Sequence, residues 1–71
     1  MRIVVEQIEV SYKMFEPGEK VMAASPRSSL DQNKVYVVVK CWRPLIPGED
    51  SAIQIEGDND RWHSTQYVIP V

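Results

Sequence analysis

The residue with the clearest chemical potential is the chain's only histidine, His63, which lies in the C-terminal stretch DNDRWHSTQYVIPV beside Trp62 and close to Tyr67. An imidazole can act as a general acid or base near neutral pH, or as a metal ligand. Catalysis needs a nucleophile or carboxylate in hydrogen-bond reach, and a metal site needs further ligands. The only cysteine, Cys41, falls in a different predicted strand. We therefore interpret His63 as a lone imidazole on a surface strand, with a metal bridged between two copies as the exception.

An acidic stretch, DND at residues 58–60, has the alternating oxygens of the start of a calcium loop. It lacks the spaced glycine and the distant bidentate glutamate that make such a loop specific. Asn and Asp favour turns because they tolerate left-handed backbone and cap their own turns. We predict a polar hairpin turn whose carboxylates, Asp58 and Asp60, hold Arg61 in a solvated cluster.

The stretch RPLIP at residues 43–47 contains a PxxP pattern with an adjacent arginine, which is the composition of a polyproline ligand. Because it lies between two predicted strands, we interpret it as a rigid loop. Its tip, Leu45 and Ile46, is apolar and exposed in this interpretation, and such exposure is typical of a contact with a partner.

Basic and aromatic residues alternate nearby, with Lys34, Lys40 and Arg43 beside Tyr36 and Trp42. Such a strand can stack bases and neutralise phosphates of single-stranded nucleic acid. Lysine stems lying over a partly covered sheet face explain the same pattern. The formal net charge of −2 disfavours a dedicated nucleic-acid-binding protein, which usually carries a basic excess.

Short runs of β-forming residues, separated by proline and glycine, must position these side chains. An amphipathic helix is the alternative for the first run, because periodicity alone does not separate the two. A tight Pro-Gly turn at 17–18 precedes the second run. The pattern predicts strands at 3–12, 20–24, 34–42, 51–56, 61–63 and 67–69, with one helical turn at 64–66.

Alternation along the strand at 34–42 predicts its buried face. One face carries Val35, Val37, Val39 and Cys41, and we expect it to join Ile53 and Ile55 in the core. The other face carries Tyr36, Val38, Lys40 and Trp42, and we expect it to be half covered or used for contact.

This order of strands, with a helical turn before the last, resembles the SH3-like barrel. Residues 15–21 and 62–71 carry the resemblance: a hydrophobe and Pro-Gly before the first barrel strand, then a hydroxyl-containing turn leading to a Tyr-Val pair. The end of the chain is also similar to small bacterial and phage-encoded SH3-like proteins. The resemblance covers 15–71 and implies a role in binding another protein. It also implies that the chain is a phage or mobile-element protein that acts on a host protein.

Signalling SH3 domains open with an Ala-Leu-Tyr-Asp-Tyr-type motif and bind PxxP ligands through an acidic loop and a tandem Trp. Neither motif is present, so only Tyr67 corresponds to their groove. The stretch SAIQI at 51–55 is similar to plasmid-borne SH3-like dihydrofolate reductases, but Glu56 stands where their pore tyrosine would be. We predict a non-enzymatic protein without a cofactor.

The chain has 71 residues, which suffice for one small domain with a single modest core. One cysteine excludes an intrachain disulfide, and the N-terminal run is too short and polar for a signal peptide or a membrane span. Both features favour a cytoplasmic protein.

We therefore expect an all-β SH3-like barrel at residues 14–71 with an N-terminal edge strand or extension at 1–13. The expected function is protein binding, with nucleic-acid binding through 34–43 as the alternative. The first run can also pair with the edge of a second copy, which predicts a homodimer. The expected binding surface comprises Tyr36, Trp42, Leu45, Ile46, Trp62 and Tyr67.

Overall fold

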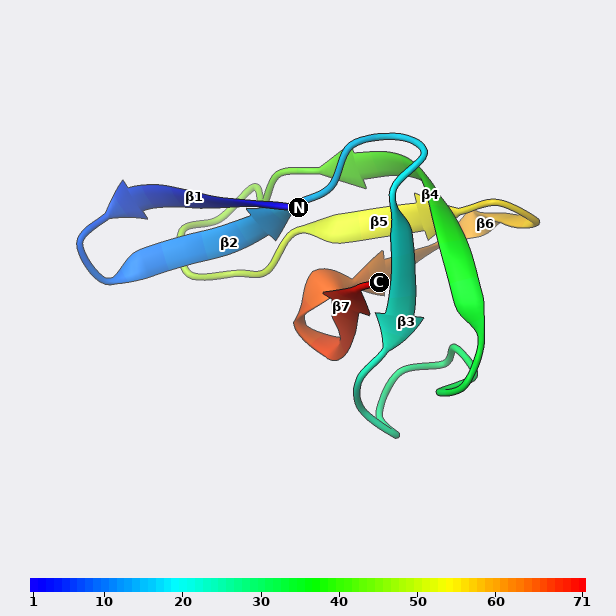
Figure 1. The fold of residues 1–71 in the computed structure, drawn as a ribbon. Helices are drawn as coiled ribbons and strands as arrows, with labels where there is room; N and C mark the ends of the chain where they lie inside the picture. Colours follow the sequence, from blue (N-terminus) through cyan, green and yellow to red (C-terminus); the bar gives the residue numbers. More distant parts are fainter.

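Seven strands in two antiparallel sheets, with one 3-10 turn, make up the described part of the chain (Figure 1). The computed structural model describes the backbone of residues 1–71 and every side chain except that of Asn59. The elements are β1 (Arg2–Gln7), β2 (Val10–Met14), β3 (Lys20–Ala23), β4 (Val35–Trp42), β5 (Ala52–Ile55), β6 (Asp58–Ser64), η1 (Thr65–Tyr67) and β7 (Val68–Pro70). The all-β prediction is confirmed, and so are the strands expected near 20–24, 34–42 and 51–56.

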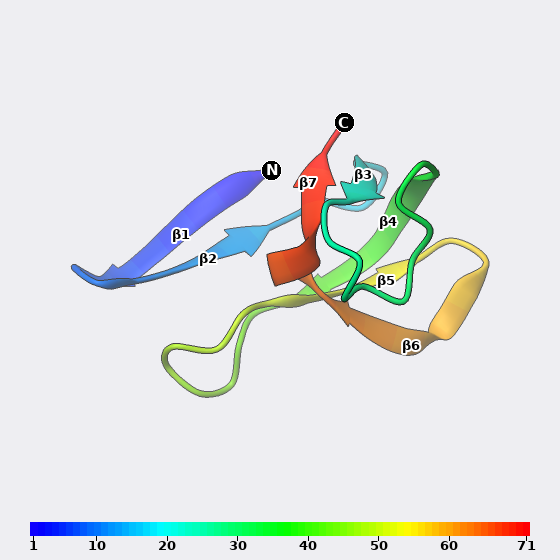
Figure 2. The same cartoon turned by 90° about the horizontal axis from the view of Figure 1, so that it is seen from below.

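The first sheet is a hairpin of β1 and β2 that extends away from the rest of the molecule (Figures 1 and 2). The prediction of one continuous strand over 3–12 is wrong, because the chain turns at Ile8 and Glu9. Neither residue is a usual turn former, so composition gave no signal for this reversal. The turn places Val4 opposite Tyr12 and Ile3 opposite Lys13.

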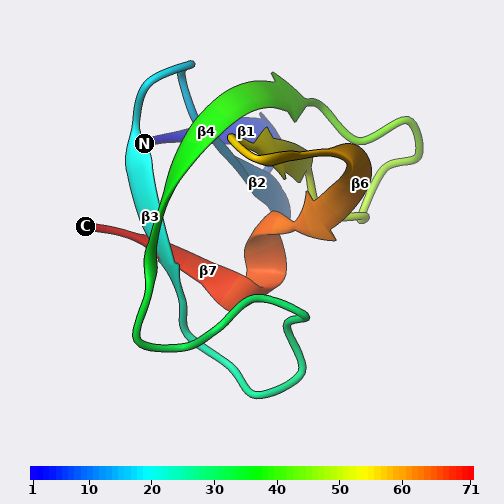
Figure 3. The same cartoon turned by 90° about the vertical axis from the view of Figure 1, so that its right-hand side faces the viewer.

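The second sheet has the strand order β6-β5-β4-β3-β7 and curves around one interior (Figure 3). Its core consists of Phe15, Val21, Ala23, Leu30, Val38, Ile53, Ile55 and Val68. The inward placement of Ile53 and Ile55 is confirmed, since both are almost completely buried. Tyr36 and Cys41 pack against this cluster.

The predicted buried face of β4 is wrong for its valines. Val38 is buried, Val35 is 46% exposed, and Val37 and Val39 are half-buried. Alternation from the buried Val38 turns Val35 and Val37 away from the core, and a β-bulge between Val38 and Lys40 then lets Cys41 turn inward.

The bulge is visible in the pairing of β4 with β5. Val38 lies opposite Ile55, and Cys41 lies opposite Ile53. Three residue steps on β4 therefore match two on β5, so the face turned inward changes along the strand. Val38 and Cys41 both point toward the core, and Trp42 points outward.

The turn between β5 and β6 is shorter than predicted. Ile55 pairs with Asp58, so Glu56 and Gly57 form the turn, and the acidic residues 58–60 belong to β6. Gly57 has φ +87°, a left-handed value that side chains with a Cβ rarely adopt. The predicted turn at 58–60 is therefore wrong in position, and the side chain of Asn59 lies outside the described residues.

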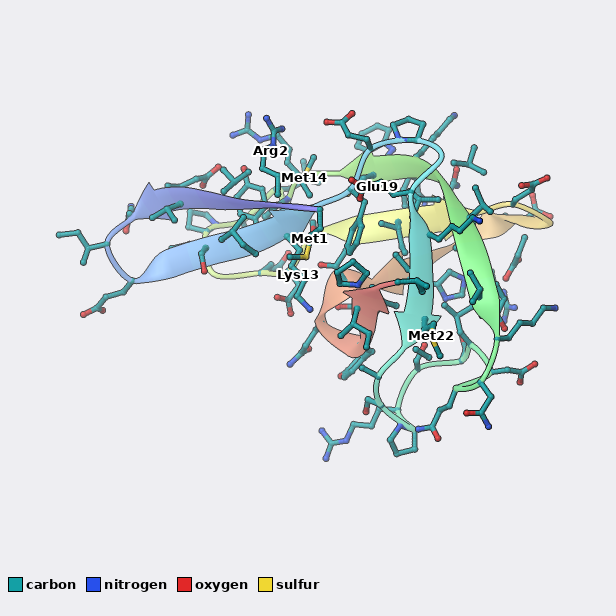
Figure 4. All side chains as sticks on the ribbon, in the orientation of Figure 1. Met1, Arg2, Lys13, Met14, Glu19 and Met22 are labelled. Atoms are coloured by element: carbon teal, nitrogen blue, oxygen red, sulfur yellow. The ribbon has the colours of Figure 1, made fainter. Side chains whose placement is uncertain are left out.

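A buried hydroxyl pair joins the two sheets. Ser51 Oγ lies 2.7 Å from Thr65 Oγ1, and both residues are at most 1% exposed. Ser51 Oγ donates its one proton to the Lys13 carbonyl at the end of β2, so the Thr65 hydroxyl proton is shared between Ser51 Oγ and the Ser51 carbonyl. The Thr65 amide donates to the same Ser51 carbonyl. Lys13 Nζ in turn donates to the Thr65 and Val68 carbonyls (Figure 4). These contacts fix the base of the hairpin against η1.

The alternation of β4 before its bulge predicts an asymmetry between two valines of the strand. Val38→Ala should lower the free energy of unfolding by about 2–3 kcal/mol, because it removes buried methyl groups and leaves a cavity. Val35→Ala should change it by less than about 0.5 kcal/mol, because Val35 is exposed. Urea unfolding followed by tryptophan fluorescence measures both. Equal losses would contradict the assignment of the inward face.

The hydroxyl pair predicts coupled energetics. Thr65→Val should destabilise the fold by about 0.5–1.5 kcal/mol, because it removes the buried hydrogen bonds of the Thr65 hydroxyl to Ser51. Ser51→Ala should cost a similar amount, and the double variant should cost less than the sum of the two. Ser11→Ala, at an exposed hydroxyl of β2, serves as the control and should be close to neutral. Additive losses in urea unfolding would show that the two hydroxyls act independently.

Candidate functional site

Both tryptophans lie on the outer face of the β4–β5–β6 part of the second sheet. Trp42 ends β4, and Trp62 lies in β6, which flanks β5 on the other side. Between them lies Ala52, which pairs with Trp42 on one strand and with Ser64 on the other. The two indole rings meet edge to face, with their centroids 5.5 Å apart. The small side chain of Ala52 keeps the sheet surface between them open.

A groove of about 340 Å³ opens at this aromatic pair. Trp42 and Trp62 remain 55% and 44% exposed, and Leu45 is 88% exposed. Monomeric proteins seldom leave several large apolar side chains exposed together unless the surface binds something. We call this the Trp groove; its lining comprises Trp42, Arg43, Pro44, Leu45, Glu49, Asp50, Ala52 and Trp62.

The charges of the Trp groove are uneven. Arg43 NH2 lies 3.2 Å from Glu6 Oε1 of the hairpin, so its charge is partly neutralised within the chain. Glu49 and Asp50 contribute two exposed carboxylates to the lining. The groove is therefore apolar with an acidic rim.

The structure brings only part of the predicted binding surface together. Trp42, Leu45 and Trp62 line one groove, and Ile46 is 59% exposed in the same loop. Tyr36 lies elsewhere: it packs against the core, and its hydroxyl accepts a hydrogen bond from the Asp31 amide.

Tyr67 lies in a separate depression of about 190 Å³ that it shares with Trp62. Trp62 thus lies between the Trp groove and this second depression. The lining of this second depression also includes Arg27, Ser28, Ser29, His63 and Ser64.

The prediction that His63 is a surface residue is wrong, because it is 6% exposed. It pairs with Ile53, so the alternation of β6 turns it toward the core. Its Nδ1 lies 3.2 Å from Ser29 Oγ, which belongs to the loop between β3 and β4. Its Nε2 lies 3.4 Å from Asp58 Oδ2, within ion-pair range but without hydrogen-bond geometry.

Ser29, His63 and Asp58 have the residue types of a hydrolytic triad, but the carboxylate is held by another group. Arg61 donates two hydrogen bonds from Nε and NH2 to Asp58 Oδ2, at 2.9 and 2.7 Å. These bonds lower the pKa of Asp58, and the carboxylate raises the pKa of the Arg61 guanidinium. In a triad the carboxylate orients and stabilises the imidazole. Here it mainly serves Arg61, and the cluster closes the core beneath the β3–β4 loop.

The lone cysteine is part of the core boundary. Burial raises the pKa of the Cys41 thiol, which holds it in the neutral form. Its Sγ accepts a hydrogen bond from the Phe15 amide and donates toward Met14 Sδ. These contacts attach β4 to the end of the hairpin.

Among the residues that the structure describes, no three His, Cys, Asp or Glu side chains are grouped to hold a metal ion. Over the same residues, no helix has the length and apolar character needed to cross a bilayer. Comparisons with protein-family models, curated proteins and solved structures gave no match.

The predicted binding surface omitted five residues that line the Trp groove: Arg43, Pro44, Glu49, Asp50 and Ala52. The two carboxylates follow a Pro-Gly turn in the predicted loop, so the composition placed them near Leu45 without indicating a common surface. Ala52 gave no signal, because its role depends on the register of β5 between its two neighbours.

The Asp58–Arg61 contact predicts a pH-dependent stability difference. A carboxyl group whose pKa is lower in the folded state stabilises the fold above its unfolded pKa and loses that effect as the pH falls through the folded value. Wild type should therefore be more stable than Asp58→Asn at pH 7, and the gap should begin to shrink below about pH 4 and close as the pH falls through the lower folded pKa.

NMR titration of the Asp58 carboxyl should give a pKa below its usual range, and Arg61→Gln should move it upward. Arg27→Gln removes the same charge from an exposed site and should leave the Asp58 titration unchanged. A stability gap that stays constant from pH 7 to pH 3 would exclude the linkage.

Proposed function

We propose that this chain is a non-enzymatic protein-interaction module of the SH3-like barrel type that binds an extended segment of a partner protein in the Trp groove. The observation that carries the proposal is the pair of half-exposed tryptophans, in contact at 5.5 Å, over an open apolar groove. Tryptophan side chains supply large contact areas at low entropic cost, and they are enriched among residues that dominate binding energy.

The strand order supports the SH3-like part of the proposal. Strands β3 to β7 form one antiparallel sheet in the order β6-β5-β4-β3-β7, and a 3-10 turn immediately precedes the last strand. Ser64 caps this turn by accepting a hydrogen bond from the Gln66 amide. Tyr67 ends this turn and Val68 opens β7, one residue later than the sequence predicts, and this order supports the resemblance.

The lining of the Trp groove selects the chemistry of the partner. Its floor and walls offer aromatic and aliphatic carbon, which favours proline, aromatic or aliphatic side chains. Glu49 and Asp50 favour a basic residue beside them, because Arg43 already faces Glu6. We infer a partner segment with Arg or Lys next to apolar residues.

The basic groups of residues 34–43 support a protein partner over nucleic acid. Lys34 Nζ lies 5.4 Å from the centroid of the Tyr36 ring, and Arg43 is paired with Glu6. Two of the three cations are thus engaged within the chain, and the groove that holds Arg43 carries two carboxylates.

The test is selection of a displayed random 12-residue peptide library on the folded protein, followed by titration of selected peptides against tryptophan fluorescence. We expect enrichment of Arg or Lys beside Pro or aromatic residues. Ala52→Leu should weaken binding at least about tenfold, because it fills the floor between the two indoles without removing either. The exposed site Ala24 provides the matched control, Ala24→Leu, which should bind like wild type.

Selection of acidic peptides, or peptides whose affinity Ala52→Leu leaves unchanged, would overturn the proposal. Tryptophan quenching by a single-stranded oligonucleotide that disappears at high salt would favour the nucleic-acid alternative instead. Unfolding of Ala52→Leu is detected separately by urea denaturation.

A further inference from the structure

The outer edge of β1 is an unpaired strand edge. Among the described residues β1 has one hydrogen-bonded neighbour, β2, and the hairpin forms a separate sheet. A free edge presents unpaired amide and carbonyl groups to any other strand. Proteins usually protect such edges with lysine, proline or a covering segment. The β1 sequence RIVVEQ contains neither lysine nor proline.

The side chains of β1 are also left uncovered. Ile3 is 52% exposed and Val5 is 64% exposed, and both precede the register shift of β1 between Val5 and Gln7. Arg2 points away from the ribbon into solvent at the base of the hairpin (Figure 4). The strand therefore offers an apolar pair and an exposed cation along an open edge.

We propose that β1 pairs antiparallel with β1 of a second copy, in a register centred on Val4. In this register Val4 faces Val4 of the other copy, and Ile3 faces Val5. Arg2 faces Glu6 at both ends of the ladder. The sequence of residues 2–6 is thus complementary to itself in both charge and apolar character, as a two-fold symmetric interface requires.

Glu6 is available for this role. The Tyr12 hydroxyl and Arg43 NH2 both donate to its Oε1, at 2.8 and 3.2 Å. Its other oxygen, Oε2, can accept from the arginine of the second copy. The existing contacts hold the Glu6 carboxylate in place on the Arg2 face of the hairpin, which reduces the entropy that pairing must remove.

The shape of the molecule permits the pairing. Strand β1 runs outward from the body of the molecule to the tip of the hairpin (Figures 1 and 2). An antiparallel partner therefore places its own body beyond that tip, so the two bodies lie at opposite ends of a four-stranded sheet. A ladder over residues 2–6 is smaller than the interface of about 1,200–2,000 Å² typical of stable complexes. We expect a reversible dimer with a dissociation constant between about 10 µM and 1 mM.

The first experiment is sedimentation equilibrium of the full chain from about 10 µM to 1 mM. Wild type should show a monomer–dimer equilibrium. Arg2→Glu should weaken it at least about tenfold, because it places like charges opposite each other at both ends of the ladder. Arg27→Glu makes the same charge change on the exposed β3–β4 loop and should dimerise like wild type.

A mixing experiment separates register from misfolding. Arg2→Glu and Glu6→Arg should each self-associate poorly, but their one-to-one mixture should restore association, because in the mixed dimer every carboxylate faces a guanidinium. A variant that failed only because it was unfolded would not be rescued by mixing. Amide NMR spectra of the single variants confirm their fold.

Cross-linking tests the centre of the register. Facing residues of an antiparallel pair have their Cα atoms about 4.5–5.5 Å apart, which is within the range that a disulfide spans. Val4→Cys should therefore form a disulfide dimer on mild oxidation. Wild type, with Cys41 alone, and Ile8→Cys, at the hairpin tip, should not.

Three results would each overturn the proposal: a strict monomer at about 1 mM, equal association of Arg2→Glu and Arg27→Glu, or no recovery on mixing. The dimer does not depend on the proposed groove function. Ala52→Leu should dimerise like wild type, and Arg2→Glu should bind selected peptides like wild type, so the two proposals fail separately.

Discussion

Ser51 and Thr65 place two hydroxyl groups in an interior that has little other polar content, and the surrounding elements are arranged around this contact. Ser51 stands at the entry to β5, Thr65 opens η1, and the Lys13 carbonyl belongs to the hairpin. Three segments that are distant in sequence therefore meet at this contact. A shift of any one of them would leave a buried polar group without a hydrogen-bond partner. In a chain of 71 residues the apolar core is small, so each buried polar contact is a larger share of what holds the elements together.

The Trp groove follows from the same arrangement. Fixing Ser51 fixes the start of β5, and the register of β5 places Ala52 opposite Trp42 on one side and Ser64 on the other. Arg43, which lines the Trp groove, forms an ion pair with Glu6 and so connects the groove to the hairpin.

Local sequence patterns predicted the strands near 20–24, 34–42 and 51–56, the helical turn before the last strand, and the burial of Ile53 and Ile55. Each of these depends on residues within one short segment. The errors share a different origin. The inward face of β4 depends on a bulge, the burial of His63 depends on its pairing with Ile53, and the reversal at residues 8–9 lacks a turn-forming residue. The contact between the two tryptophans also depends on register across three strands, which composition does not encode.

The direction in which Trp42 points depends on the number of residues in β4. Val38 and Trp42 are four positions apart, so an uninterrupted pleat would turn both side chains the same way. The extra residue between Val38 and Cys41 is the reason that one fills the interior while the other faces solvent. Deleting one residue there would turn the Trp42 indole inward and leave Trp62 without its partner on the outer surface. Deleting one residue of β4 therefore disturbs the core and the outer surface more than substituting one residue does.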